Sequence, residues 1–160
     1  MFKIRPIKKS DNKELAQIIR ASLEQKGVNR PGTVYTDSTT DNLFELFQAK
    51  NSFYYVIEKN NEILGGCGIY PTKDLPLNYC ELVKLYIKPK AKGQGLGKLL
   101  MDSCTNWAKE HHYTHLYLET LKELKSAVSL YEEQGFSYLA KSLGDSGHNA
   151  CDILMLKKID

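Results

Sequence analysis

A glycine-rich turn is the part of this chain with the clearest potential for chemistry. It reads KGQGLGK over residues 92–98, and apolar residues follow it at helical spacing, including Leu100, Cys104 and Ala108. The first N–H groups of a helix lack intrahelical partners and lie at the positive end of its dipole, and glycine lets a ligand approach the main chain. The turn is therefore predicted to bind an anion such as a phosphate group.

Two common nucleotide-binding motifs do not fit this spacing. The dinucleotide pattern G-x-G-x-x-G needs a glycine where Lys98 follows Gly93 and Gly95. The P-loop needs a glycine five residues before Gly97 and a hydroxyl side chain in place of Leu99. Neither of these nucleotide-binding folds is indicated.

The turn instead resembles the pyrophosphate loop of the GNAT superfamily of acyl-CoA-dependent N-acetyltransferases. That signature is Q/R-x-x-G-x-G/A between a strand and a helix, and Lys92, Gly95 and Gly97 occupy its three fixed positions, with lysine replacing glutamine or arginine. A second block over residues 130–136, LYEEQGF, is similar to the L-Y-E-x-x-G-F segment of the same family. Together the two blocks extend the resemblance over about residues 79–138.

This resemblance implies a GNAT fold of the α/β (α+β) class. We expect a twisted, mixed but mostly antiparallel sheet of about six to seven strands, about four flanking helices, and a parallel strand pair that splays at the acetyl-CoA site. Acetyl-CoA is the implied co-substrate, with direct acetyl transfer to a primary amine in a ternary complex. The implied cofactor-binding residues are Leu85, Tyr86, Ile87, Lys92, Gly93, Gln94, Gly95, Leu96, Gly97 and Lys98.

The same resemblance suggests catalytic groups, each of which also has a simpler structural interpretation. The N–H at the Leu85 position faces the thioester carbonyl in the family and would stabilise an oxyanion; the alternative to this favoured role is an ordinary ladder hydrogen bond. Glu81 lies where some members place a general base, with Glu119 as the competing candidate; either could be a surface carboxylate. Tyr131 matches the tyrosine that protonates the departing thiolate, or it is a half-buried aromatic residue on the inner side of its helix.

The acceptor site is less sharply indicated. Glu81, Glu119 and Asp152 would favour a cationic amine, whereas Lys84, Arg30 and His148 could hold a carboxylate. The predicted substrate-binding residues are Tyr35, Lys84, Thr120, His148 and Asp152. We expect a primary amine on a small molecule, with a protein lysine or N-terminus, or a non-catalytic acyl-CoA-binding module, as the alternatives.

Histidine and cysteine spacing does not indicate a metal site. His111, His112 and His115 straddle a helix end and the next strand without a patterned acidic or cysteine partner. The four cysteines are widely separated, so neither zinc binding nor a disulfide framework is expected. We predict that most of them are small buried residues and that Cys151 packs rather than acts as a nucleophile.

Size and charge limit the remaining choices. With 160 residues and 42% hydrophobic content, the chain can form the core of a single domain over residues 1–160. The net charge of +3 is small for a dedicated nucleic-acid binder, although lysines cluster near the turn. No apolar leader or bilayer-length segment is present, so we expect a cytoplasmic protein without nucleic-acid or membrane partners; the sequence allows a homodimer.

Alternation and helical periodicity predict the elements that position these residues. Strands are expected at 2–5, 53–58, 63–70, 81–87, 115–119, 136–140 and 150–156; helices are expected at 11–27, 43–47, from the glycine turn to about 110, and at 123–133. Asp11 and Glu14 are expected to cap the first helix. A strand, a crossover helix and a strand imply a parallel pair around the turn.

Two further segments are expected to shape the site. The irregular residues 28–40 separate two predicted helices, and such segments often form binding sites. Gly65, Gly66 and Gly68 interrupt the strand at 63–70, which predicts a bulge or the close approach of another group.

Overall fold

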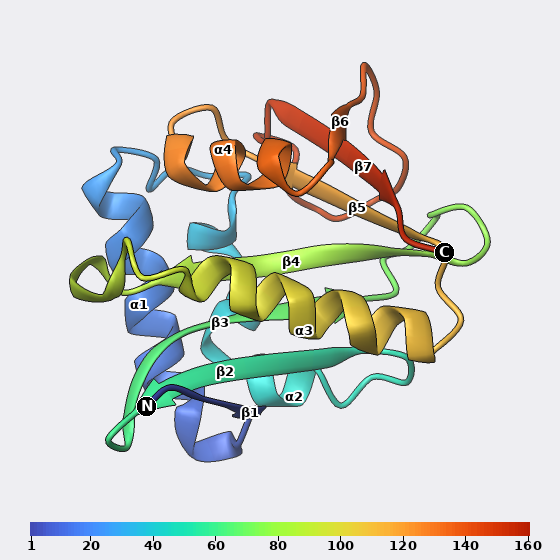
Figure 1. Cartoon of the computed structure of the whole chain (residues 1–160). Coiled ribbons are helices and arrows are strands. Elements are labelled where there is room, and N and C mark those ends of the chain that lie inside the picture. Colours follow the sequence, from blue (N-terminus) through green and yellow to red (C-terminus); the bar gives the residue numbers. More distant parts are fainter.

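Seven strands form one mixed sheet in the computed structural model, which describes all residues from 1 to 160 (Figure 1). Their order is β1-β2-β3-β4-β5-β7-β6, and only the β4 and β5 pair is parallel. The strands are β1 (Lys3–Pro6), β2 (Phe53–Lys59), β3 (Glu62–Tyr70), β4 (Tyr79–Ile87), β5 (His115–Thr120), β6 (Ser137–Tyr138) and β7 (Ile153–Lys158). The predicted mixed, mostly antiparallel sheet is confirmed.

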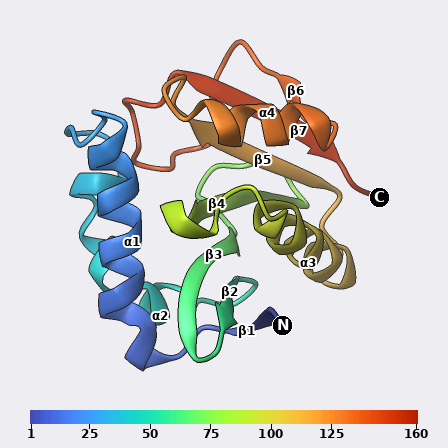
Figure 2. The same cartoon turned by 60° about the vertical axis from the view of Figure 1, so that its left-hand side comes forward.

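Four α-helices cover the two faces of this sheet. They are α1 (Asn12–Gln25), α2 (Leu43–Leu46), α3 (Leu96–Glu110) and α4 (Lys125–Glu133), accompanied by the 3-10 helices η1 (Lys9–Asp11), η2 (Val34–Thr36), η3 (Ser38–Asp41) and η4 (Pro89–Ala91). The views in Figures 1 and 2 show α1 and α2 on one face and α3 and α4 on the other. No helix is both long enough and apolar enough to cross a bilayer.

Each face of the sheet has its own apolar core. Leu100, Cys104 and Ala108 of α3 are fully buried in one core, and Leu15 and Ile19 of α1 are buried in the other. Their i, i+4 spacing places them on one side of each helix. Because burial of one leucine contributes roughly 1.5–3 kcal/mol, these rows hold both helices firmly on the sheet.

The boundaries of several elements differ from those expected. β4 begins at Tyr79, because Tyr79 and Cys80 already pair with β5. β7 runs from Ile153 to Lys158 rather than over 150–156, because it follows the register of β5 as far as His115. β6 contains only Ser137–Tyr138. α4 begins at Lys125 rather than 123, because the preceding residue, Leu124, has a non-helical ψ of 61°.

Asp11 does not cap α1 as the sequence suggested. Its carboxylate instead accepts two hydrogen bonds from the Arg5 guanidinium, at 2.8 and 3.0 Å, and one from the Lys8 amide at 2.7 Å. Arg5 is 9% exposed and also donates to Glu58. A buried guanidinium needs such carboxylate partners, so the ion pair takes the acceptor that the helix would otherwise use.

β2 and β3 form the predicted hairpin. The connecting residues Asn60 and Asn61 both have left-handed backbones, with φ values of 52° and 63°. Two such residues are the signature of the type I′ turn that joins twisted antiparallel strands.

β4 separates from β5 and bulges within the same strand. The parallel pairing joins only Tyr79–Glu81 to His115–Tyr117. Further along, Lys84 and Leu85 together face one residue of β3, Cys67, which is the geometry of a β-bulge. The backbone of Lys84 has a φ of 54°, which is unusual for a residue other than glycine. The strand therefore places Val83 and Lys84 successively toward the α1 face and returns Leu85 to the α3 face.

The glycines of β3 leave room for an aromatic ring that reaches this bulge. A methyl group on Gly66 would lie 2.7 Å from the Tyr54 hydroxyl oxygen, and one on Gly68 would lie 2.6 Å from the same ring. The Tyr54 hydroxyl crosses β3 and donates a 2.9 Å hydrogen bond to the Lys84 carbonyl. The expectation of a bulge or close approach at these glycines is confirmed, although the extra residue at the site belongs to β4.

Candidate active site

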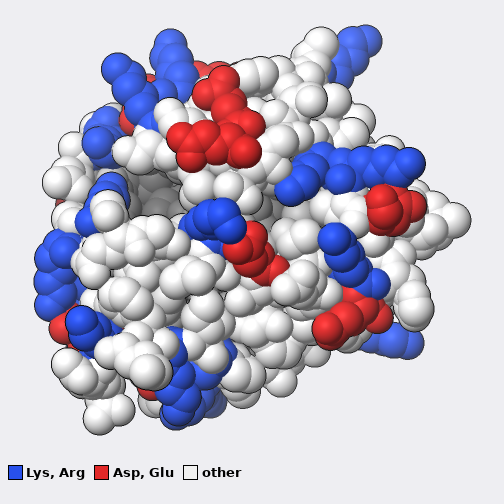
Figure 3. All heavy atoms as spheres, viewed as in Figure 1, with Lys and Arg blue, Asp and Glu red and all other residues white.

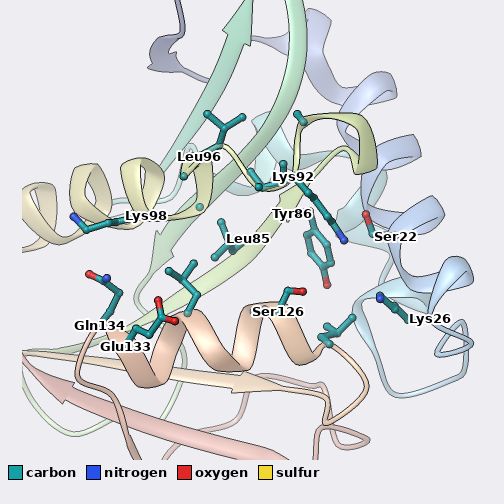
Figure 4. A pocket seen from close by; sticks show the side chains of 18 residues that line it. Ser22, Lys26, Leu85, Tyr86, Lys92, Leu96, Lys98, Ser126, Glu133 and Gln134 are labelled. Carbon is teal, nitrogen blue, oxygen red and sulfur yellow. The ribbon is translucent and has the colours of Figure 1, made fainter.

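A cavity of about 490 Å³ opens between the end of β4, the glycine turn and α4 (Figure 4). Leu85, Tyr86 and Ile87 form its floor, and Ser126, Ala127 and Leu130 of α4 form one wall. The remaining lining residues are Ser22, Lys26, Ala91, Lys92, Gly93, Gly95, Leu96, Gly97, Lys98, Leu124, Glu133 and Gln134.

The glycine turn presents main-chain groups to this cavity. Gly93 and Gly95 have φ values of 80° and 76°, which glycine adopts without steric cost, and no atom lies within 4 Å of a methyl group placed on either residue. Gly95 directly precedes the first residue of α3. The free amides of the helix start and the positive end of its dipole therefore border open space, which suits a phosphate group.

Three lysines add positive charge at the rim. Lys26 comes from the end of α1, Lys92 from the turn and Lys98 from α3, while Glu133 is the one carboxylate of the lining. Lys98 forms an ion pair with Asp102, with 2.8 Å between Nζ and Oδ2, whereas Lys26 and Lys92 form no ion pair. In Figure 3, blue atoms gather around a hollow at the left of the view, where Figure 1 places the turn and the ends of α1 and α4.

Nine of the ten residues predicted to bind the cofactor line this cavity. Gln94 is the exception, since its side chain turns back to donate to the Ala91 carbonyl at 3.4 Å. Sequence reasoning missed Ser22 and Lys26, which α1 brings to the turn from some seventy positions earlier in the chain. The sequence did show that Lys26 lies at the end of the first predicted helix. It did not show that this end of the helix lies beside the glycine turn.

A second cavity, of about 500 Å³, lies beside the first part of β4 and is lined mostly by polar residues; it is called the polar cavity below. Residues of the predicted acceptor site, Lys84 and His148, line it together with Glu81. The other lining residues are Gly32, Thr33, Thr36, Asp37, Thr39, Leu46, Tyr70, Thr72, Lys73, Val83, Asp145, Ser146 and Gly147. The irregular segment 28–40 thus does help to form a cavity.

Glu81 is the buried carboxylate of the second cavity. It is 3% exposed and accepts a 2.6 Å hydrogen bond from the Thr72 hydroxyl. Burial raises the pKa of Glu81 from 4.5 to about 7; the charge of Glu119 acts in the same direction, and the Thr72 hydrogen bond and the charge of Lys84 oppose it. A carboxyl group with a pKa near neutrality can accept a proton from an amine and release it to solvent.

Lys84 and Asp37 form a loose ion pair beside Glu81. The distance from Lys84 Nζ to Asp37 Oδ2 is 3.8 Å, and the Lys84 side chain is 3% exposed. Asp37 Oδ2 lies 2.7 Å from His148 Nε2, and this hydrogen bond lowers the pKa of Asp37. Burial lowers the pKa of Lys84. The Lys84 ammonium has no hydrogen-bond acceptor in the protein.

Glu119, the competing candidate base, does not line either cavity. Its carboxylate accepts hydrogen bonds from Tyr117 at 2.6 Å, from Ser142 at 3.2 Å and from Ser146. Ser146 itself lines the second cavity, so only the Ser146 hydroxyl group connects Glu119 to the lining.

Four other predicted site residues lie outside both linings. Tyr35 accepts a hydrogen bond from Arg20 through its carbonyl, and Thr120 is buried at the end of β5. Asp152 accepts from the Lys122 amide at 3.0 Å. Tyr131 is 7% exposed beside Phe136, and its hydroxyl has no hydrogen-bond partner in the protein, while burial raises its pKa well above the usual value of 10.

His111, His115 and the cysteines pack against other residues of the fold. His111 stacks on Trp107 with ring centroids 3.8 Å apart, and His115 stacks on Tyr79 at 4.2 Å. Cys67, Cys80 and Cys104 are buried, and Cys151 is partly buried. Burial raises the pKa of Cys151 to about 12, which disfavours the thiolate form that a nucleophile needs.

Strand β4 contributes lining residues to both cavities. Glu81, Val83 and Lys84 line the polar cavity, and Leu85, Tyr86 and Ile87 line the cavity of the glycine turn. The change occurs at the bulge, between two consecutive residues. The linings of the two cavities are therefore adjacent along β4.

Comparison with known proteins gives a consistent family assignment. Residues 15–136 match the model of the Acetyltransferase (GNAT) family. YjgM of Escherichia coli (strain K12), an uncharacterized N-acetyltransferase, is 34% identical over 150 residues, which cover 93% of this chain and 90% of YjgM. The alignments to seven further curated relatives cover between 26% and 62% of the lengths of those proteins.

Solved structures share the whole fold. An acetyltransferase of the GNAT family from Staphylococcus aureus Mu50 has a TM-score of 0.85 at 17% identity, with complete coverage of both chains. YncA of Salmonella typhimurium, a putative acetyltransferase solved with acetyl-CoA, has a TM-score of 0.75 at 20% identity and covers 100% of this chain and 95% of its own.

Proposed function

The chain belongs to the GNAT family of acetyltransferases, and on this premise we propose that it transfers the acetyl group of acetyl-CoA to the primary amine of a small molecule. The reaction is a direct transfer in a ternary complex. The amine nitrogen bonds to the thioester carbonyl carbon, the carbon–sulfur bond breaks, and the amine loses a proton.

In this proposal the 490 Å³ cavity holds the co-substrate. The amides of the turn, together with Lys92 and Lys26, bind the pyrophosphate, since their donors and charges border the same open space. The main chain of residues 85–87 pairs with the pantetheine arm. The supporting observation is that this stretch of β4 has left β5 and faces the cavity instead.

The Leu85 amide is assigned to the thioester carbonyl oxygen. Its position directly after the bulge supports this role, because Lys84 and Leu85 share one partner residue across the sheet. A fixed main-chain donor at this point stabilises the negative charge that develops on the oxygen during attack.

Glu81 is the proposed general base. Its burial and its pKa of about 7 make it a better proton acceptor than an exposed glutamate, and it lines the cavity that receives the amine. We prefer it to Glu119, whose oxygens already accept from three hydroxyl groups.

Tyr131 is the proposed proton donor to the departing sulfur. Its hydroxyl is unengaged by other protein groups, burial keeps it protonated, and the preceding residue Leu130 lines the co-substrate cavity. It would donate to the sulfur as the carbon–sulfur bond breaks.

The observation that carries the proposal is the switch of β4 from one cavity to the other between Lys84 and Leu85. This arrangement lets an amine approach the thioester from the polar side. The test combines calorimetry of acetyl-CoA binding with thiol release in the presence of a panel of amines and peptides.

We expect acetyl-CoA to bind and at least one small amine to release thiol and gain one acetyl group by mass spectrometry. Binding without amine-dependent release would identify a non-catalytic acyl-CoA module. Acetylation of peptides alone would identify a protein-modifying enzyme. Either result would overturn the small-molecule proposal.

A further inference from the structure

Lys84 is a buried cation without a hydrogen-bond acceptor. Its side chain is 3% exposed, it lines the polar cavity, and no protein oxygen accepts from Nζ. A buried ammonium is costly unless an acceptor or an opposite charge compensates it. Nζ itself has almost no accessible surface, so a ligand oxygen would contact it after a small movement of the side chain toward the cavity that Lys84 lines.

The neighbouring carboxylates do not supply the missing acceptor. Asp37 lies 3.8 Å away, and its two oxygens already accept from His148 on one side and from the Thr39 amide and hydroxyl on the other. Glu81 accepts from Thr72. Both carboxylates stand near the ammonium without forming a hydrogen bond to it.

The bulge is what directs Lys84 to this place. Regular alternation would send the residue after Val83 to the apolar α3 face, but the φ of 54° turns Lys84 to the same side as Val83. The Tyr54 hydroxyl holds the Lys84 carbonyl at 2.9 Å. The cation is therefore built into the main-chain feature that separates the two cavities.

We propose that Lys84 binds a carboxylate of the acceptor, and that the acceptor is a small amino acid whose amine and carboxylate belong to one short skeleton. This inference rests on the proposed acetyl transfer. Glu81 and Lys84 lie three residues apart on one strand and line the same cavity, so a basic carboxylate and a cation face one ligand. They match the two ends of an amino acid, the amine toward Glu81 and the carboxylate toward Lys84.

The remaining charges of the cavity fit a single carboxylate rather than a phosphate group. Lys73 is the only other lysine in the lining and is exposed, His148 is held by Asp37, and Asp145 adds a further negative charge. The carboxylates around this single buried cation would repel a doubly charged anion more strongly than a singly charged carboxylate.

The direct test compares amino acids with their own carboxamides as acceptors. The carboxamide keeps the shape and the amine but removes the negative charge. A charge-assisted hydrogen bond of this kind should give the acid a kcat/KM roughly 10- to 100-fold above that of the amide in the wild type. Lys84→Met keeps the length of the side chain and should bring this ratio close to one.

Lys73→Met is the matched control, because it removes a lysine from the same cavity at an exposed position. It should change the ratio of acid to amide by at most about twofold, since exposed charges are screened. A ratio that falls equally in Lys73→Met and Lys84→Met would mean that general electrostatics, not contact with Lys84, selects the acid.

A binding measurement separates this inference from the transfer reaction. Calorimetry on the CoA-loaded protein would compare the N-acetyl derivatives of the same amino acids with those of their carboxamides. We expect the acids to bind more tightly in the wild type, and equally in Lys84→Met.

Equal or weaker binding of the acids by the wild type would overturn the role of Lys84, as would carboxyl-free amines that react as well as the amino acids. Acetyl transfer to those amines would leave the proposed function intact. Carboxylate binding without any transfer would instead overturn the proposed function and leave the inference about Lys84 standing.

Discussion

Replacement of Glu81 by glutamine should make the protein more stable at alkaline pH and less active. Glu81 is 3% exposed, and burial raises its pKa from 4.5 to about 7. Because one pKa unit corresponds to about 1.4 kcal/mol, ionisation of this group in the folded state costs about 3 kcal/mol more than in the unfolded chain. Glutamine avoids this cost, and its side-chain oxygen can still accept from Thr72.

The sign of the pH dependence follows from proton binding. Between pH 4.5 and about 7 the folded wild type binds more protons at Glu81 than the unfolded chain does. The contribution of Glu81 to stability is therefore complete below pH 4.5 and is lost as the pH rises through about 7. Above this range Glu81→Gln should be more stable than the wild type by up to about 3 kcal/mol, or roughly 6–12 °C in Tm.

Thermal unfolding followed by circular dichroism over this pH range measures the difference, with Glu110→Gln as the control because Glu110 is exposed. In parallel, kcat/KM of the wild type should rise with an apparent pKa near 7, whereas Glu81→Gln should lose this limb and roughly 100- to 10,000-fold of its rate. A stability difference that does not vary with pH would refute the reasoning from burial. An unchanged pH–rate profile would remove Glu81 from the mechanism.

Three further variants test the rest of the site. Tyr131→Phe should lower kcat at least roughly 100-fold with little change in acetyl-CoA affinity, and undiminished turnover would refute its role as a proton donor. Gly95→Ala, at a φ of 76°, should cost about 1 kcal/mol of stability and weaken acetyl-CoA binding in calorimetry, whereas Gly27→Ala at a φ of 70° should cost stability alone. Tyr54→Phe removes the hydrogen bond to the Lys84 carbonyl. It should lower the free energy of unfolding by about 1–3 kcal/mol, seen as a lower Tm, and should also lower kcat/KM. An unchanged kcat/KM would mean that the bulge holds its shape without Tyr54.

Local signals in the sequence were sufficient to identify the helices and strands, although not all of their ends, and the glycine turn. Apolar residues at a spacing of 3.6 identify α1 and α3, and the glycines of the turn need φ values that other residues avoid, so both features depend on residues close together in the chain. The resemblance to the GNAT family supplied the topology.

The contacts that shape the second cavity could not be predicted in the same way, although Glu81, Lys84 and His148 of its lining were named from the sequence. The bulge at Lys84 depends on Cys67 across the sheet and on the Tyr54 hydroxyl thirty residues away. Asp37 and His148 are 111 residues apart, and neither stands in a pattern that indicates the other. Such contacts arise from packing between distant segments, and the sequence contains no periodic signal for them.

The short junction between β4 and β5 also has a mechanical consequence. Strands β1 to β4 and strands β5 to β7 form two parts of the sheet, and the strand pairing between them consists of three residues of β4 and three of β5. A ligand between Leu85 of β4 and Leu130 of α4 would contact both parts of the molecule where the two strands no longer pair. The protein with acetyl-CoA bound should therefore allow less relative motion of these two parts than the free protein does. Saturation with acetyl-CoA should also raise the melting temperature by mass action.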